Sequence, residues 1–175
     1  CRPRHCQHRL RLRHLRGLWQ DRPAGHGEEA QGDARRRGYC GGAAVTPAER
    51  QAIEWECARL VALYANLNDA HRWEDVVALY HPDGLMTRPT APDAEIRGHE
   101  AILAAFKARP PRTTRHFCSN VVIEVEDAQN ARGECAILLF TGSGAPLVGS
   151  FHDRFVATEQ GWRFLERRGS LTFQP

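Results

Sequence analysis

The chain has 175 residues, enough for one hydrophobic core of ordinary size. No run of apolar residues approaches the roughly 18 that a membrane-spanning helix needs, so we expect no membrane partner. The net charge of +3 averages two unlike parts. Residues 1–44 carry ten arginines and four acids (+6), and the remaining 131 residues carry 14 basic and 17 acidic groups (−3). The charge pattern therefore divides the chain near residue 44.

Residues 1–44 show neither helical nor strand periodicity, and their apolar side chains are too sparse to offset the entropy of ordering. We interpret this segment as a disordered or spurious extension, with Val45 as the first native residue. One alternative is a basic arm for nucleic acid, although we expect no nucleic-acid partner. Another is a zinc site built from Cys1, His5, Cys6 and His8. Such a site would lack a second ligand pair at a standard spacing. One domain then covers residues 45–175.

The six cysteines are scattered without a C-x-x-C pair, and the charged N-terminus contains no apolar stretch typical of a secretory signal. We therefore expect free thiols in a reducing environment and a cytoplasmic protein.

The first predicted element of the domain is a helix over residues 47–68. Thr46, Pro47 and Glu49 have the spacing of an N-cap, a first-turn proline and a capping-box partner. Apolar side chains then recur at helical spacing as far as Leu67.

Two shorter helices and two short strands are expected next. Apolar residues at i, i+3, i+4 and i+7 predict a helix over residues 73–80, ended by turn residues 81–84. The segments "LMTRPT" and "AEIRG" predict short strands on either side of Pro92. A third helix is predicted over residues 99–108, where two prolines stop it.

The second half of the domain is rich in β-branched and aromatic residues. Turn segments separate four predicted strands, over residues 113–126, 132–142, 146–158 and 161–173. Three helices followed by an antiparallel meander predict an α+β domain, and a strongly twisted sheet can leave a pocket at its mouth.

The motifs "YANLNDAHRWEDVVALYHPDG", "IRGHEAILAAF", "TRHFCSN" and "GSFHDRFVATEQGWRFLERR" occur in this order. Together they resemble the SnoaL-like branch of the nuclear transport factor 2 superfamily over about residues 47–173. The resemblance implies a cone of three N-terminal helices packed into a strongly curved, mostly antiparallel sheet. It also implies a small-molecule site, no cofactor, and a homodimer or homotrimer. Members include polyketide cyclases, scytalone and bile-acid dehydratases, and small subunits of ring-hydroxylating dioxygenases.

Three residues match the catalytic residues of the dehydratase-type members: Tyr64, Asp69 and His116. A histidine can move a proton near neutral pH, a carboxylate can fix its tautomer, and a tyrosine hydroxyl can bind an oxyanion. We expect Asp69 to raise the pKa of His116 above the free-imidazole value. Each residue also has a structural alternative, because Asp69 could cap the second helix, Tyr64 could pack in the core, and His116 could be an ordinary strand histidine.

Four further residues are predicted to bind substrate. Trp73 follows Asp69 by four positions, and Asn120 shares strand parity with His116 unless a β-bulge intervenes. Counting along the strand places the equivalent of the second catalytic histidine of scytalone dehydratases near Thr141. Asp153 and Arg154 point to opposite faces of one strand, and Arg154 is the predicted contact.

No histidine pair or H-E-x-x-H motif is present among residues 45–175, so we expect no catalytic metal. The resulting hypothesis is a cofactor-independent lyase or isomerase, dehydratase- or cyclase-like, acting on a hydrophobic polycyclic or aromatic hydroxy-carbonyl compound. The alternative is a non-catalytic binding or assembly subunit resembling the small subunit of ring-hydroxylating dioxygenases.

Overall fold

The computed structural model describes residues 44–142 and 144–173. The predicted extension, apart from Ala44, and its zinc and nucleic-acid alternatives lie outside these residues. Within them, no helix is both long enough and apolar enough to cross a membrane.

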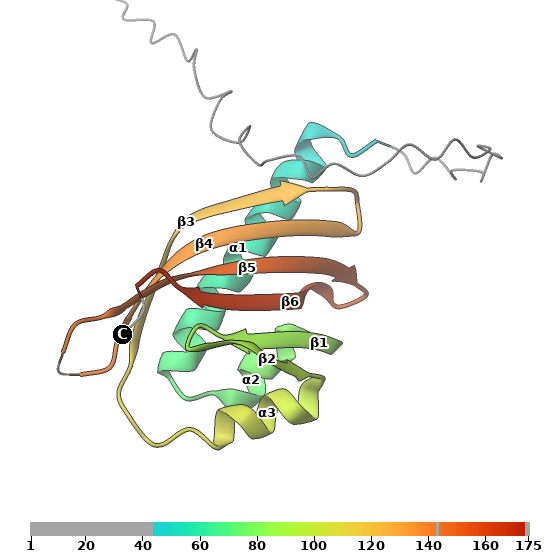
Figure 1. Cartoon of the computed structure of the whole chain (residues 1–175). Helices are drawn as coiled ribbons and strands as arrows, with labels where there is room; N and C mark the ends of the chain where they lie inside the picture. The colour runs from blue at the N-terminus through green and yellow to red at the C-terminus, as the bar shows by residue number, and fades with distance from the viewer. Residues whose placement is uncertain (1–43, 143, 174–175) are drawn as a thin grey trace, which may run out of the picture. The chain divides into compact units, whose positions relative to one another are not determined.

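The domain begins with the long helix α1 (Pro47–Asp69). The Thr46 hydroxyl accepts a hydrogen bond from the Glu49 amide, and the Glu49 carboxylate accepts one from the Thr46 amide, so the predicted capping box is present. The apolar face of α1 is buried from Ile53 to Tyr64. The helix runs across one face of the sheet (Figure 1) and so provides one wall of the core.

Two short helices and two strands follow: α2 (Trp73–Ala78), β1 (Tyr80–Arg88), β2 (Ala91–Arg97) and α3 (His99–Lys107). The predicted turn at residues 81–84 is wrong, because this segment is extended and forms the first half of β1. Gly84 permits this path, since an added Cβ would lie only 2.8 Å from the carbonyl oxygen of His81. Both helices lie beside β1 and β2 (Figure 1).

The second half of the domain contains four long strands: β3 (Arg115–Val125), β4 (Asn130–Phe140), β5 (Leu147–Thr158) and β6 (Gly161–Leu171). The order in the sheet is β2-β1-β6-β5-β4-β3, and every pair is antiparallel except β1 with β6. The sheet is curved and does not close (Figure 1). The predicted α+β class and the curved, mostly antiparallel sheet are confirmed.

Candidate active site

Asp69 and His116 meet where the end of α1 approaches the start of β3. His116 Nδ1 lies 2.6 Å from Asp69 Oδ1, and the His116 backbone amide donates to Asp69 Oδ2 at 2.8 Å. The Thr114 hydroxyl donates to Asp69 Oδ1 at 2.9 Å. Both side chains are about nine-tenths buried, at 7% exposed for Asp69 and 10% for His116. One carboxylate thus fixes the position of the strand and of the imidazole.

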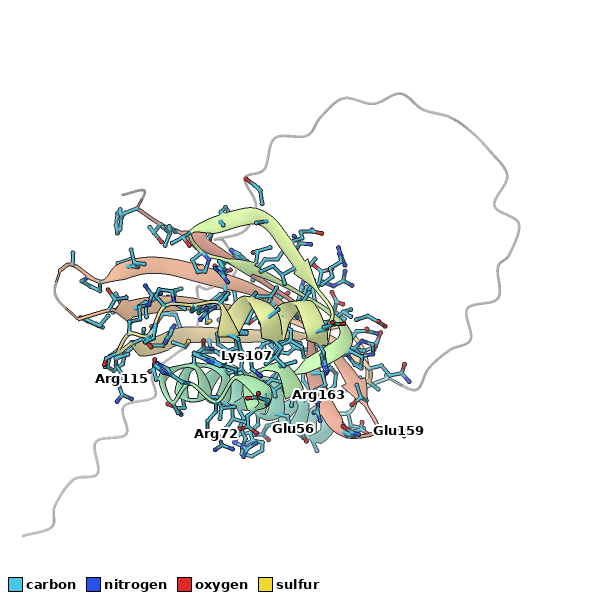
Figure 2. All side chains as sticks on the ribbon, turned by 90° about the horizontal axis from the view of Figure 1, so that it is seen from below. Glu56, Arg72, Lys107, Arg115, Glu159 and Arg163 are labelled. Carbon is cyan, nitrogen blue, oxygen red and sulfur yellow. The ribbon has the colours of Figure 1, made fainter. Side chains whose placement is uncertain are left out.

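The hydrogen bonding of Asp69 determines the tautomer of His116. An ionised carboxylate only accepts hydrogen bonds, so Nδ1 carries the proton and Nε2 is the nitrogen left for a substrate. The guanidinium of Arg115 also approaches this carboxylate, with Nη1 3.9 Å from Asp69 Oδ2. Arg115 points away from the body of the domain (Figure 2) and is largely exposed.

The alternative in which Asp69 caps α2 is wrong. The N-cap of α2 is Arg72, and no side chain caps this helix. Asp69 is instead the last residue of α1, and its side chain is directed to β3.

A cavity of about 530 Å³ lies beside the Asp69–His116 pair. Its floor and walls come from α1, α2, the ends of β1 and α3 with the segments that follow them, and strands β3 to β6. Predicted residues Tyr64, Trp73 and His116 all line it, whereas Asp69 lies behind His116. The part of the wall formed by β4, β5 and β6 is apolar and consists of Ile137, Leu139, Leu147, Phe151 and Leu171.

Tyr64 and Trp73 are held by aromatic packing. The Tyr64 ring meets Phe106 and Phe151 edge-on, at centroid distances of 6.4 and 5.7 Å. Trp73 stacks on Phe106 at 5.4 Å. The core-packing alternative for Tyr64 is therefore correct as far as the ring is concerned, and it is compatible with a site role because Tyr64 also lines the cavity.

The pKa of His116 is lowered, not raised as the sequence led us to expect. Burial is the main cause, because it penalises the charged imidazolium. The hydrogen bond and charge of Asp69 act in the opposite direction, and the positive charges of Arg109 and Arg167 add to the decrease. His116 is consequently neutral at pH 7 and able to accept a proton.

Three predicted substrate-binding residues do not line the cavity. Asn120 is exposed and has a positive φ of 52°. It lies in a β-bulge, where β3 advances three residues while β4 advances two, so strand parity with His116 is lost. Thr141 is exposed just beyond the end of β4. Arg154 is exposed on the outer face of β5, and Asp153 is the residue that faces inward.

Sequence reasoning missed four polar residues that line the cavity, Asn68, His71, Arg88 and Arg109, and also the buried Arg167, which does not line it. Asn68 is buried and donates to the Tyr64 carbonyl at 3.0 Å, while its own carbonyl oxygen accepts from Arg109 Nη1 at 3.0 Å. His71 is exposed but lines the cavity, and its ring stacks on Trp73 at a centroid distance of 5.1 Å. Strand parity would have misplaced Arg167, because a register shift in β6 between Phe164 and Glu166 puts Arg167 on the same buried face as Trp162 and Phe164.

The residues of the site do not resemble a metal centre. No group of three histidine, cysteine, aspartate or glutamate side chains gathers in a metal-binding arrangement within residues 44–142 and 144–173. The site residues described above are instead suited to proton transfer and to binding a polar group beside an apolar wall.

Comparison with known structures identifies the fold. A provisionally named scytalone dehydratase from Novosphingobium aromaticivorans has a TM-score of 0.65 at 20% identity, covering 73% of this chain and 89% of that one. An NTF2-like protein with a cystatin-like fold from the same organism has a TM-score of 0.65 at 23% identity, covering 71% and 85%. A hexachlorocyclohexane dehydrochlorinase of type 2 has a TM-score of 0.65 at 15% identity, covering 73% and 90%. At these identities the likeness establishes the fold alone.

The fold and cavity thus define the class as α+β proteins of the nuclear transport factor 2 type. Residues 49–168 match the family model of the SnoaL-like domain, and the chain belongs to that family. A search of curated proteins finds no match to this sequence.

Proposed function

We propose that the protein is a cofactor-independent lyase or isomerase, dehydratase- or cyclase-like, that acts on a hydrophobic polycyclic or aromatic hydroxy-carbonyl compound. The observation that carries the proposal is the 2.6 Å contact between Asp69 Oδ1 and His116 Nδ1, which leaves Nε2 as the proton acceptor at the cavity. The names of two structural neighbours, a dehydratase and a dehydrochlorinase, are consistent with elimination chemistry.

In the proposed reaction, His116 Nε2 removes a carbon-bound proton next to the substrate carbonyl. The electron pair of that C–H bond forms the new C=C bond as the C–O bond to the β-hydroxyl group breaks. The departing hydroxide takes a proton from the imidazolium or from the Tyr64 hydroxyl and leaves as water. Where Tyr64 gives the proton, it regains one from the imidazolium, so the enzyme returns to its starting state.

Each protein group has a defined part in this scheme. Asp69 keeps the proton on Nδ1 and stabilises the imidazolium when it forms. The Tyr64 hydroxyl donates a hydrogen bond to the substrate carbonyl oxygen, where negative charge develops, or to the departing hydroxyl group. The apolar wall of β4 and β5 binds the ring system and excludes water from the reacting atoms.

The test is turnover by the His116→Ala variant. A panel of polycyclic and aromatic hydroxy ketones is screened for the rise in ultraviolet absorbance that accompanies a conjugated double bond. With any compound that reacts, His116→Ala is expected to lower the rate by about 10²–10⁴-fold. The matched control is His152→Ala, because His152 is an exposed histidine on the outer face of β5. Undiminished turnover by a folded His116→Ala protein would show that the chemistry lies elsewhere.

The non-catalytic alternative is favoured by one observation, an exposed apolar patch on the outer face of β3 and β4. This outer patch consists of Phe117, Leu138 and Phe140, which are 54%, 39% and 40% exposed. The rings of Phe117 and Phe140 lie 5.9 Å apart. Exposed apolar clusters of this kind mark interaction surfaces.

We propose a second copy of this chain as the occupant of the outer patch, in agreement with the dimers and trimers of the family. Sedimentation equilibrium is expected to give a dimer or trimer for the unchanged protein and a monomer for Phe117→Lys. A monomer for the unchanged protein would contradict this. If a larger partner binds through the patch and no hydroxy-carbonyl compound reacts, the assembly-subunit function is the correct one.

A further inference from the structure

The charges that line the cavity are all of one sign. Four arginine and lysine side chains contribute to the lining, namely Arg88, Lys107, Arg109 and Arg112, and none of the described residues that line it is acidic. Lys107 is exposed and is paired with Glu74 at 2.7 Å, and Arg112 is exposed. Arg88 and Arg109 are only partly exposed, so their charges act most strongly inside the cavity.

Arg109 is fixed in place without a carboxylate. Its Nη1 donates to Asn68 Oδ1 at 3.0 Å, and its guanidinium carbon lies 4.1 Å from the centroid of the Phe106 ring. Burial lowers the pKa of Arg109, and the charge of Arg88 adds to that decrease. The guanidinium is thus held rigidly beside another cation at the edge of the cavity.

Arg88 has a similar environment. Its Nη2 donates to the Ala105 carbonyl at 2.6 Å, and its Nε is buried without a hydrogen-bond partner. Neither Arg88 nor Arg109 forms an ion pair with a carboxylate of residues 44–142 and 144–173. Partly buried charges are normally compensated, so two uncompensated guanidinium groups on one cavity indicate that the anion comes from outside the chain.

We propose that the cavity binds a substrate carrying a carboxylate, which Arg109 and Arg88 hold, while the ring system of the substrate packs on the apolar wall formed by β4 and β5. A planar carboxylate matches the two-pronged donor geometry of a guanidinium group. This inference refines the proposed function, because it names the substrate class for the same cavity. His116 and Arg109 both line that cavity, so the carboxylate lies within the same bound molecule as the reacting carbon.

The test measures binding and needs no turnover. Naphthoate and the naphthamide with the same ring position have nearly equal size and differ in charge, so calorimetric titration of each isolates the contribution of the anion. The unchanged protein is expected to bind naphthoate about 10- to 100-fold more tightly, as for hydrogen bonds to a charged group. Equal affinity for the two compounds would overturn the proposal.

Variants then locate the anion site. Arg109→Gln and Arg88→Gln are each expected to lose most of the preference for naphthoate. Arg154→Gln is the matched control, because it removes one arginine from the exposed outer face of β5 and should keep the preference. A preference that survives in both cavity variants would overturn the assignment, and two variants protect the test if one fails to fold.

The outcomes separate this inference from the proposed function. His116→Ala is expected to bind naphthoate with the unchanged preference although it loses turnover. If the unchanged protein shows no preference for naphthoate while His116→Ala still abolishes turnover, the carboxylate proposal fails and the acid–base mechanism stands.

Discussion

Two buried aspartates of the domain are each paired with a basic side chain, and the two pairs differ in access. Asp69 and His116 are at the wall of the cavity, whereas Asp153 and Arg167 are cross-strand neighbours on β5 and β6 that do not line it. Arg167 is 0% exposed and Asp153 is 3% exposed. The first pair can reach a substrate, and the second is enclosed by the core.

The two pairs also differ in how their polar atoms are satisfied. Asp69 accepts hydrogen bonds from Thr114 and from two nitrogens of His116. In the second pair, Asp153 Oδ1 and two nitrogens of Arg167 have no hydrogen-bond partner, although Arg167 Nη1 lies 2.5 Å from Asp153 Oδ2. Aromatic rings cover the guanidinium instead, with Phe151 at 3.9 Å and Tyr64 at 4.3 Å.

The comparison separates a proton-transfer pair from a structural pair. An imidazole changes its protonation near neutral pH, but a guanidinium does not, so Arg167 cannot replace His116 as a base. Arg167 nevertheless affects the site, because its fixed charge helps to lower the pKa of His116. Four experiments test this division, and the largest effect is expected in the enclosed pair.

Replacing Asp153 with Asn is expected to destabilise the fold by about 3–5 kcal/mol, because it leaves a buried guanidinium without its counter-ion. Denaturant unfolding followed by circular dichroism measures the change. Glu134→Gln is the control, since Glu134 is exposed on β4 and should change stability by no more than about 0.5 kcal/mol. If the Asp153→Asn protein were as stable as the unchanged protein, a structural role for the Asp153–Arg167 pair would be contradicted.

Replacing Asp69 with Asn is expected to slow turnover by about 10- to 100-fold, the effect of losing a hydrogen bond to a charged group. The double variant with His116→Ala should be little slower than His116→Ala alone, because the two residues act as one unit. Asp93→Asn on exposed β2 serves as the control. Losses that multiply in the double variant would show that Asp69 does not act through His116.

Replacing Tyr64 with Phe removes only the hydroxyl group, and the ring keeps its packing against Phe106 and Phe151. The melting temperature should stay close to that of the unchanged protein. The rate of the chemical step should fall by about 2- to 10-fold, as for the loss of one neutral hydrogen bond. Single-turnover kinetics separates this step from binding, and an unchanged rate would assign Tyr64 to packing only.

The smallest expected effect is in the pH profile. Neutral His116 is the base, and burial holds its pKa below the ordinary value of 6.5 despite the opposing effect of Asp69. Turnover should therefore rise with pH, with its midpoint below about pH 6.5. Asp69→Asn removes the opposing carboxylate and should move the midpoint to lower pH. A midpoint above about pH 6.5 would show that the Asp69 charge outweighs burial.

The same shift affects stability in a defined direction. His116 binds a proton less readily in the folded state than in the unfolded state. Its contribution to the free energy of unfolding is therefore fully present above about pH 6.5, and it is lost as the pH falls through the lower folded-state pKa. Unfolding of His116→Ala should accordingly depend less on pH in this window.

Periodicity predicted the helices and the four long strands within a few residues, because burial of one face leaves a repeating pattern in the sequence. The chemistry of the site is less visible. Resemblance to the family indicated Asp69 and His116, but Arg88 and Arg109 come from segments whose meeting depends on tertiary packing. The position of Asn120 could not be read from alternation, because one extra residue in β3 changes the parity. The lowered pKa of His116 depends on burial and on Arg167, which is 51 positions away (167 − 116).

The parallel pairing of β1 with β6 has a consequence for synthesis of the chain. β1 is made before β3, β4 and β5, and β6 after them, yet β1 and β6 are neighbours in the sheet. Until β6 is made, the β1–β2 hairpin has no strand to join it to β3–β5, although α1 already contacts β3. Closing such a long loop is slow, and apolar surface on both halves is exposed until then. The cavity is therefore complete only after Gly161–Leu171, which supplies Leu171 to its lining, has left the ribosomal tunnel.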